Sequence, residues 1–527
     1  MYHKAAQRLK ALIDLQDKSI LTQSLTGLEK ETLRVNPEGS IAQTPHPASL
    51  GSALTNPYIT TDYSEALLEI VTPPFQDLDS VLQFLTDTQR FIYSQLNDEL
   101  LWATSMPCVV AGSTSIPIAQ YGSSNAGMMK TIYRKGLGHR YGRVMQVIAG
   151  VHFNFSFSDD FWQTFFDITQ QQGNFQDLKS ENYFSLLRNL QRFGWMVPYL
   201  FGASPAVCKS FLQGQETSLQ SFNENTYFQP YATSLRMGDI GYQNNKENNI
   251  GVVANYNNLH SYISSLKHAI ETPCPEYEKL GLIVDGQYQQ LSSNILQIEN
   301  EYYSTVRPKQ IVHKYEKPIE ALRTRGVRYV ELRSLDVNAF HPLGIDEVQL
   351  HFLQTFMLFC LCHESPNIDE NEKLDIDTNE MLTAHKGRDP ALRLTRNGTD
   401  ISIKDWGNEV LDEMQGFAEL MDDAFATTAY SQSIKQQKQA INDPECTPSA
   451  RMLDEMREKG EGFYQYAMRM SRHHQYTFAS GKLSEEKIRF YQELAKTSIE
   501  EQLALEKSDS LSYATFIQRY FANTLSE

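Results

Sequence analysis

Two glutamates stand one residue apart in a stretch that reads like a β-strand, residues 27–35 (GLEKETLRV). On a strand, alternate side chains point to the same side, so Glu29 and Glu31 share a face with Leu33 and Val35. Their Cα atoms would be roughly 7 Å apart. Two like charges on a face that favours burial are costly unless a cation lies between them. A metal ion, a lysine or water could separate the two charges.

A second group of acids lies in residues 59–74 (ITTDYSEALLEIVTPP), which allow two interpretations. As a helix, this segment would place Asp62, Glu65 and Glu69 on one solvated face. As a strand over residues 66–72, it would place Glu69 among apolar residues on both faces, and two prolines would end it. The continuous apolar residues on either side of Glu69 favour the strand, in which a buried carboxylate needs a partner.

Two further strand-like stretches carry polar chemistry on one face. Residues 150–157 (GVHFNFSF) place His152 opposite a face of valine and phenylalanine side chains. Residues 326–340 (GVRYVELRSLDVNAF) place Glu331 and Arg333 on one face. Taken singly, a lone histidine or a Glu-x-Arg pair is most often structural.

Taken together, the four stretches indicate a sheet with an apolar back and an acid-rich front. Carboxylates with one imidazole are suitable ligands for Mg²⁺ or Mn²⁺. Clustered Mg²⁺ mostly neutralises and orients polyphosphate. Arg333, beside Glu331, would then stabilise charge on a phosphoryl group during its transfer.

Neither of two glycine-rich segments is a phosphate-binding loop. Residues 122–131 resemble a P-loop but have two extra residues before Lys130. Residues 136–142 miss the dinucleotide-binding fingerprint by one residue and follow no clear strand. A nucleotide would therefore have to be bound through metal ions or clustered arginines.

Composition limits the classes of function. The chain has 527 residues and a net charge of −17, which argues against nonspecific binding to nucleic acid or to an anionic membrane. It has no apolar run long enough to span a bilayer and no signal-peptide core at its N-terminus. Six cysteines without a Cys-x-x-Cys pattern argue against structural zinc, and Cys360 and Cys362 are expected in a buried apolar segment. We therefore expect a cytoplasmic enzyme with reduced cysteines.

The elements that must position these residues alternate irregularly. Helical patterns cover about residues 2–16, 78–98 and 179–201, with short strand-like runs between and after them. From about residue 404 the strands fade and helical spacing dominates. We expect a catalytic core over residues 1–403 and, over residues 404–527, a helical C-terminal region that packs on the core and is not an independent domain. The irregular alternation favours the α+β class over a doubly wound parallel sheet.

Seven segments between about residues 20 and 350 resemble the motifs of bacterial glutamate–cysteine ligase of the γ-proteobacterial type. In order, they read GLEKETLRV, ITTDYSEALLEIVTPP, GVHFNFSF, RFGWMVPYLFGASPAVC, PYATSLRMGDIGYQN, LQIENEYYSTVRPK and GVRYVELRSLDVNAF. The helical tail after residue 404 matches the family much less well.

This resemblance implies a reaction and a fold. The reaction is the first step of glutathione synthesis, in which ATP, L-glutamate and L-cysteine give γ-glutamylcysteine, ADP and phosphate. The implied fold is a curved, mainly antiparallel sheet that forms a funnel-shaped active site, as in glutamine synthetase and the guanido kinases, with helices around it. The resemblance further implies Mg²⁺, with Mn²⁺ as a substitute, ATP as co-substrate, glutathione as a feedback inhibitor, and a monomer.

The resemblance also assigns site residues position by position. The metal ligands fall on Glu29, Glu31, Asp62, Glu69, His152 and Glu331. The catalytic arginine that faces the phosphoryl group falls on Arg333. The amino-acid pocket falls on Tyr63, Tyr133, Arg236, Tyr242 and Tyr303. Tyr63 departs from the better-known members, which have phenylalanine there, and Glu65 receives no role.

Three alternatives stay open at this stage. One is a ligase that joins the same carboxylate to a different amine, and another is phosphoryl transfer to glutamate alone. Product analysis with and without cysteine separates these two. The third is a binding module for metal or amino acid without catalysis, and the complete set of acids with Arg333 argues against it.

Overall fold

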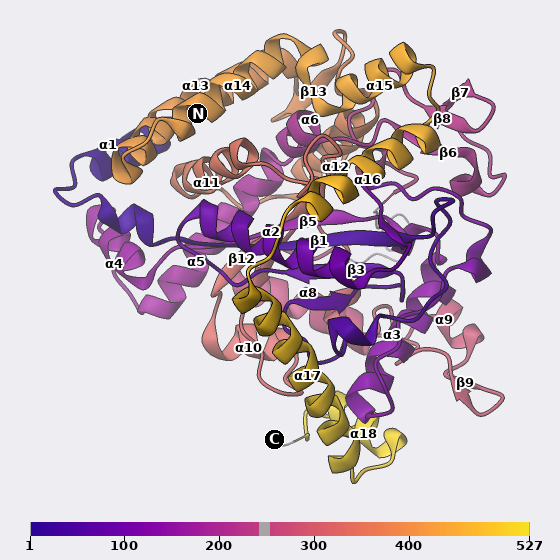
Figure 1. Ribbon diagram of the computed structural model, residues 1–527. Helices are drawn as coiled ribbons and strands as arrows, with labels where there is room; N and C mark the ends of the chain where they lie inside the picture. The colour runs from indigo at the N-terminus through magenta and orange to yellow at the C-terminus, as the bar shows by residue number, and fades with distance from the viewer. Residues whose placement is uncertain (1, 242–252, 526–527) are drawn as a thin grey trace.

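A seven-stranded antiparallel sheet lies at the centre of the computed structural model, which describes residues 2–241 and 253–525 (Figure 1). The strands run in the order β11-β12-β5-β1-β3-β2, and β4 pairs with the end of β1. Their bounds are β1 Leu25–Val35, β2 Ile59–Thr61, β3 Leu67–Val71, β4 Leu100–Leu101, β5 Gly150–Ser156, β11 Val306–Lys309 and β12 Tyr329–Asp336. The α+β class with an antiparallel sheet is confirmed, as is the strand interpretation of residues 66–72.

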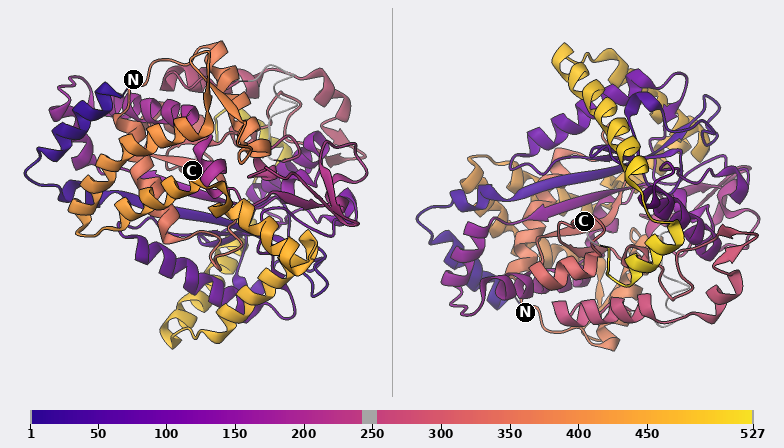
Figure 2. Two further views of the ribbon diagram at one scale, coloured as in Figure 1. Left: turned by 90° about the horizontal axis from the view of Figure 1, so that it is seen from above. Right: turned by 90° about the horizontal axis from the view of Figure 1, so that it is seen from below.

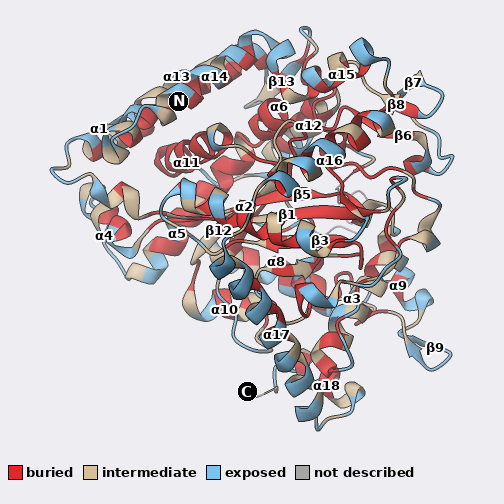
Figure 3. Cartoon of the chain, in the orientation of Figure 1, coloured by how far each residue is buried: buried red, intermediate tan, exposed pale blue. Residues whose placement is uncertain are grey.

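The apolar back of the sheet is a continuous row of side chains across three strands. Leu28 of β1 pairs with Phe153 of β5, and Phe153 pairs with Leu332 of β12. All three are buried, and the central strands are almost wholly buried in Figure 3. Burying this row on one side fixes the strand register, because a slip of one residue would turn the acids inward.

Seventeen helices are described around the sheet and its extensions (Figure 2). They are α1 His3–Ile13, α2 Leu78–Gln95, α3 Asn125–Tyr141, α4 Asp159–Ile168, α5 Phe175–Arg192, α6 Met196–Phe201, α8 Leu259–Glu271, α9 Pro275–Leu280, α10 Pro318–Arg325, α11 Glu347–Cys362, α12 Glu370–Lys386, α13 Ile403–Phe425, α14 Ala429–Asn442, α15 Pro448–Lys459, α16 Phe463–Ser480, α17 Glu485–Ser508 and α18 Tyr513–Phe521. In the described part of the chain, none is both long and apolar enough to cross a membrane.

Smaller antiparallel units extend the core. They are β6 Ala206–Cys208 with β7 Gln220–Asn223 and β8 Thr226–Phe228, the hairpin of β9 Ile283–Val284 with β10 Gln287–Tyr288, and the hairpin of β13 Arg393–Arg396 with β14 Thr399–Ser402.

Helices α2, α5 and α6 pack against strands of the sheet, and α11 packs against α2 and α5. Lys30, between the two glutamates of β1, points to the other side and donates from Nζ to Oε1 of Gln89 in α2 at 2.6 Å. Burial lowers the pKa of Lys30 to about 7.

Helix α11 is buried from Gln349 to Cys362, which explains its all-round apolar sequence and confirms the expected burial of Cys360 and Cys362.

The C-terminal region is helical from Ile403 onward, as predicted. Helices α13 and α14 pack on α11, and α17 leads to α18, which lies beside α3 (Figure 1). The boundary at residue 403 and the dependence of this region on the core stay predictions.

Two expectations from the sequence are wrong in this structure. The helix expected over residues 179–201 is two helices, α5 and α6. Gly194 lies in the break, where a Cβ atom would come within 2.7 Å of the Leu190 carbonyl oxygen. The cysteines are not all reduced, because Cys108 and Cys208 form a disulfide with Cα atoms 5.5 Å apart. These two are separated by 100 residues, so their spacing along the chain gives no signal of pairing.

Candidate active site

A cavity of about 510 Å³ lies on the face of the sheet that carries Glu29 and Glu31. Strands β1, β3, β5, β11 and β12 contribute to it, and α3, the segments 145–148 and 298–318, and α18 form its walls. Its charged lining residues are Glu29, Glu31, Asp62, Glu69, Lys130, Arg134, His152, Arg307, Lys309, Glu316, Glu331 and Arg333. All six metal ligands predicted from the sequence therefore lie in one cavity.

Glu29 and His152 are cross-strand partners in β1 and β5. Nδ1 of His152 lies 3.0 Å from Oε2 of Glu29, and Asn154 donates to Oε1 of the same carboxylate at 2.9 Å. Burial opposes the ionisation of Glu29. The hydrogen bond with His152 and the nearby positive charges together outweigh this effect, so the pKa of Glu29 is lowered. Glu29 is thus held ionised in a fixed position.

Glu31 and Glu69 face each other directly across β1 and β3. Oε2 of Glu31 accepts a hydrogen bond from the backbone N–H of Gly150 at 2.7 Å. Burial raises the pKa of both carboxyls, and the charges of Glu29, Asp62 and Glu31 raise that of Glu69 further. Because these acids are crowded together, a cation bound between them would stabilise their ionised forms.

The donor set fits a divalent metal ion. One ligand atom from each of Glu29, His152 and Glu331 can be chosen so that all three lie within 4.8 Å of one another. Carboxylate oxygens with a single imidazole are the ligands that Mg²⁺ and Mn²⁺ accept, whereas the thiolates that zinc favours are absent from the described lining residues.

Positive side chains lie at the β12 side of this acid cluster. Nη1 of Arg333 donates to Oε1 of Glu331 at 2.8 Å, and Nζ of Lys309 lies 3.3 Å from Oε2 of Glu331. Burial opposes ionisation of Glu331, yet these cations lower its pKa well below the usual range. The cavity thus places fixed cations beside a row of carboxylates, which suits a polyphosphate bound with metal ions.

Sequence reasoning missed Arg307 and Lys309 of β11. Arg307 is the register partner of Glu331, so alternation places both cations on the face of the acids. The segment 306–309 (VRPK) carries this signal, but it is short and contains a proline, so it does not read as a central strand.

Three of the predicted tyrosines line the same cavity. Tyr303 and Gln146 exchange hydrogen bonds of 2.6 and 2.9 Å, and Tyr133 projects from α3. The hydroxyl of Tyr63 is buried and has no hydrogen-bond partner among the described residues. It packs on Gly138, where a Cβ atom would lie only 2.4 Å from it.

Neither of the other two residues predicted for the amino-acid pocket is among the described lining residues of the cavity. Arg236 is buried, does not line the cavity, and donates from Nη2 to the backbone carbonyl of Arg333 at 2.8 Å. Tyr242 lies outside the described residues. Glu65, the acid left without a role, accepts hydrogen bonds from the backbone N–H groups of His46 and Gln120 at 2.9 and 2.8 Å, so its carboxylate is structural.

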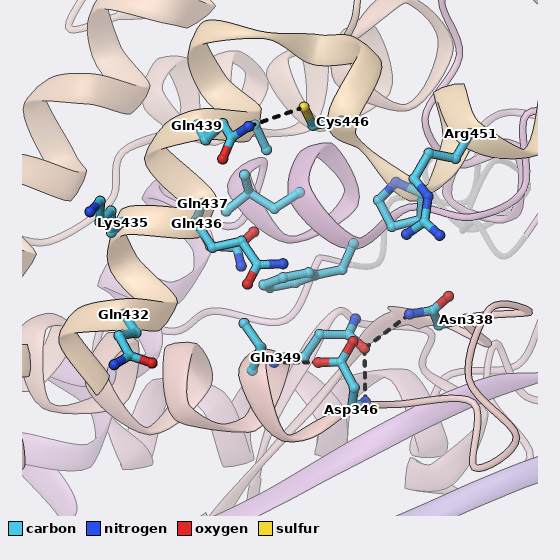
Figure 4. Close-up of a pocket in the computed structure, with 15 residues that line it drawn as sticks. Asn338, Asp346, Gln349, Gln432, Lys435, Gln436, Gln437, Gln439, Cys446 and Arg451 are labelled. Carbon is cyan, nitrogen blue, oxygen red and sulfur yellow. Dashed lines mark hydrogen bonds between the residues drawn. The ribbon is translucent and has the colours of Figure 1, made fainter. Parts of the chain in front are cut away.

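A second cavity, of about 420 Å³, lies between α6, α11, α14 and α15, and most of its polar lining side chains are amides (Figure 4). Asp346 is the single acidic residue among the described residues that line this cavity. Its carboxylate accepts a hydrogen bond from the backbone N–H of Gln349 at 2.8 Å and caps α11. Without grouped carboxylates this cavity does not suit metal-dependent chemistry. The first cavity is therefore the candidate active site.

Comparison with known proteins points to one family. A family model described as glutamate–cysteine ligase matches residues 9–382. The chain is 45% identical over 520 residues to a glutamate–cysteine ligase of Alcanivorax borkumensis, covering 98% of this chain and 99% of the relative. It is 46% identical over 506 residues to one of Pseudomonas putida, covering 96% of each. The crystal structure of a glutamate–cysteine ligase from Francisella tularensis in complex with AMP matches with a TM-score of 0.89 and 35% identity, covering 95% of this chain and 98% of that one.

Glu69→Gln should stabilise the protein in the absence of metal at pH 8. The folded-state pKa of Glu69 is raised above its unfolded value, so the wild type loses stability as the pH rises from the unfolded pKa through the folded one. Removing the charge should raise the free energy of unfolding by on the order of 1 kcal/mol or more. Thermal unfolding in a chelating buffer measures this, and the gain should shrink towards pH 4.5.

Glu65→Gln is the matched control. The carboxylate of Glu65 accepts two backbone hydrogen bonds, so this variant should be less stable than the wild type. Adding Mg²⁺ should stabilise the wild type more than Glu69→Gln. A Glu69→Gln protein that is less stable than the wild type at pH 8 without metal would show that the acid cluster is not under electrostatic strain.

Proposed function

The chain belongs to the glutamate–cysteine ligase family, and we propose that the cavity on its antiparallel sheet is where this ligase carries out its reaction. The enzyme uses ATP to join the γ-carboxylate of L-glutamate to the amine of L-cysteine, giving γ-glutamylcysteine, ADP and phosphate. The observation that supports this site most strongly is the convergence of six metal-ligand candidates and Arg333 on one sheet face.

The reaction needs two steps because a carboxylate is a poor electrophile. An oxygen of the γ-carboxylate attacks the γ-phosphorus of ATP, and the bond to the bridging oxygen of ADP breaks. The cysteine nitrogen then attacks the carbonyl carbon of the acyl phosphate, phosphate leaves with the electron pair of the C–O bond, and the nitrogen loses a proton. A cavity walled on several sides protects the acyl phosphate from water.

Glu29, Glu31, Asp62, Glu69, His152 and Glu331 would hold the divalent metal ions. Bound Mg²⁺ would neutralise the phosphates and offset their repulsion from the γ-carboxylate. The chain's own contribution is to fix the positions of these ligands: Gly150 and Asn154 each donate to a carboxylate, and β1, β3 and β5 hold the carboxylates in register.

Arg333 is proposed to act on the phosphoryl group as it transfers, and its contacts support this role. Its guanidinium lies at the cavity surface between Glu331 and His152, at 2.8 and 3.4 Å from their nearest atoms. Lys309 adds a second positive charge on the same side of the acid cluster. Such an arrangement stabilises negative charge on three equatorial oxygens without moving during the reaction.

The amino-acid substrates would occupy the side of the cavity near Tyr63, Tyr133 and Tyr303. Tyr303 is supported by Gln146. The hydroxyl of Tyr63, which has no hydrogen-bond partner among the described residues, gives this enzyme an additional polar group next to that side. Roles for Arg236 and Tyr242 in amino-acid binding stay proposals from the family resemblance. The family resemblance is also the basis for four further proposals: Mg²⁺ as the preferred metal, a monomeric state, a cytoplasmic location and inhibition by glutathione.

The direct test is phosphate release from ATP by the purified protein with Mg²⁺. Release should require both glutamate and cysteine, and the dipeptide should be linked through the γ-carboxyl, as mass spectrometry of the product can establish. The small amine 2-aminobutyrate should replace cysteine with moderate activity, because the reacting group is the amine. An α-linked product, or undiminished release without cysteine, would contradict this function.

Arg333→Lys should lower kcat by about 100-fold, because lysine keeps the charge but loses the bidentate fork. The KM values for glutamate and cysteine should change much less, since the lost interaction is made mainly in the transition state. Steady-state kinetics measure both quantities. Arg328→Lys is a matched control, because Arg328 ion-pairs with Asp159 at 3.6 Å and does not line the cavity. Near-full kcat in Arg333→Lys would remove Arg333 from the mechanism.

A further inference from the structure

The cavity between α6, α11, α14 and α15 is separate from the catalytic cavity. None of its described lining residues also lines the cavity that contains Glu29 and Arg333. Its volume of about 420 Å³ lies in the range of cavities that bind small molecules. Leu200 and Phe201 of α6 and Ala440 of α14 give it an apolar side. A molecule bound here would therefore not compete for the residues to which the reaction is assigned.

One buried amide opens into this cavity without a partner. On the buried face of α14, Tyr430 donates to Gln354 at 2.6 Å and Ser433 donates to the Val348 carbonyl at 2.7 Å. Gln437 lies on the same face, is 5% exposed and lines the cavity, but its amide makes no hydrogen bond within the described part of the chain (Figure 4). A buried amide without a partner is costly. The fold alone does not account for a glutamine here, whereas a bound molecule would.

Further amides line the same space. In Figure 4 the side chains of Gln436 and Gln437 lie next to each other between α14 and the segment that leads into α11. Asn338 and Gln349, which are buried, line the cavity from that segment and from the first turn of α11. Each side-chain amide offers both donors and an acceptor, which is the pattern that a peptide group needs from its partner.

A guanidinium group is held at one end of the cavity. The guanidinium of Arg451 in α15 lies over the ring of Phe340, 4.0 Å from its centroid, and pairs with no carboxylate in the described part of the chain. Asp346 does not neutralise it, because its carboxylate caps α11. A guanidinium already fixed on an aromatic ring loses little further freedom when it pairs with a carboxylate through two hydrogen bonds.

We propose that this cavity binds a small peptide-like anion, which is a molecule with amide groups and a free carboxylate. The carboxylate would pair with Arg451, and its amides would bond to Gln437 and to Asn338 or Gln349. Asn338 lies two residues beyond the end of β12, so the bound molecule would connect α14 and α15 to the end of a strand of the catalytic floor. It would stabilise the folded chain in proportion to its occupancy.

Cys446 lines the cavity and can report on its occupancy. It is exposed, whereas the other free cysteines, Cys274, Cys360 and Cys362, are buried. Partial burial and a hydrogen bond to Asp443 raise the pKa of its thiol, so alkylation with iodoacetamide is run at pH 9 and located by mass spectrometry of peptides. The probe is N-acetylglycylglycine, which has two amides and a carboxylate but no amine or thiol. Its carboxamide is the matched neutral probe.

In the wild type, N-acetylglycylglycine at about 20 mM should slow the alkylation of Cys446 about tenfold, as a Kd of about 2 mM predicts. The carboxamide, and inorganic phosphate at the same concentration and ionic strength, should each slow it less than about twofold, because the first lacks the carboxylate and the second lacks the amides. Saturating ADP with Mg²⁺ should leave the protection unchanged, since the two cavities share no described lining residue.

Gln437→Leu and Arg451→Met should each reduce the protection of Cys446 to less than about twofold. The rate with the probe is compared with the rate without it in each variant, because Arg451 also influences the thiol. Arg457→Met is the matched control and should keep full protection. Arg457 is on the same helix, pairs with Asp454 at 2.9 Å and does not line the cavity.

Thermal unfolding without the probe gives a second readout. Gln437→Leu should unfold at the same temperature as the wild type or higher, because it removes a buried amide that has no partner in the described chain. Gln354→Leu should unfold at a lower temperature, because the amide of Gln354 donates to Thr26 at 3.0 Å and accepts from Tyr430.

Three results would overturn the inference: unchanged alkylation of the wild type with N-acetylglycylglycine, equal protection by the carboxamide or by phosphate, or protection that both Gln437→Leu and Arg451→Met retain. Each would stand whatever the outcome of the phosphate-release assay, because the proposed site does not depend on the catalytic cavity.

Discussion

The mutual repulsion of buried carboxylates on one sheet face is the constraint on which the rest of the structure depends. Glu31 faces Glu69 across one strand pair, and Glu29 faces His152 across the next. Such a face is unfavourable without cations, so it persists only because the other face is strongly favourable. The row of Leu28, Phe153 and Leu332 and the helices that cover it supply that favourable burial. Apolar packing on the back thus holds in place the charges that make the front able to bind metal and phosphate.

Much of the floor could be predicted from the sequence because it depends on alternation within single strands. Glu29 with Glu31, His152, and Glu331 with Arg333 each follow from a period of two within a few residues. Features that depend on contacts between distant segments could not be predicted in this way. The disulfide of Cys108 with Cys208 joins positions 100 residues apart, and Arg236 meets the site through the backbone of Arg333. The family resemblance, and not periodicity, connected the separate strands to one substrate set.

The C-terminal region shows the same limit in another form. Its helical character is plain in the sequence, because charged and apolar residues recur with helical spacing. Nothing in that spacing says where the helices dock. The structure places α13 and α14 on α11, which supports the back of the sheet, and α18 on α3, which walls the front. One region of the chain therefore serves both faces of the sheet, and its last helix connects packing at the periphery with the shape of the catalytic cavity.

The measurement that bears most directly on the acid cluster is a titration with Mn²⁺ followed by electron paramagnetic resonance of the free ion. In the presence of a non-hydrolysable ATP analogue, the wild type should bind Mn²⁺ tightly, and Glu29→Gln and Glu331→Gln should each lose bound Mn²⁺. Glu65→Gln should match the wild type, because its carboxylate is engaged with backbone N–H groups. Equal Mn²⁺ binding by the wild type and by both Glu29→Gln and Glu331→Gln would show that the carboxylates of this sheet face are not a metal site.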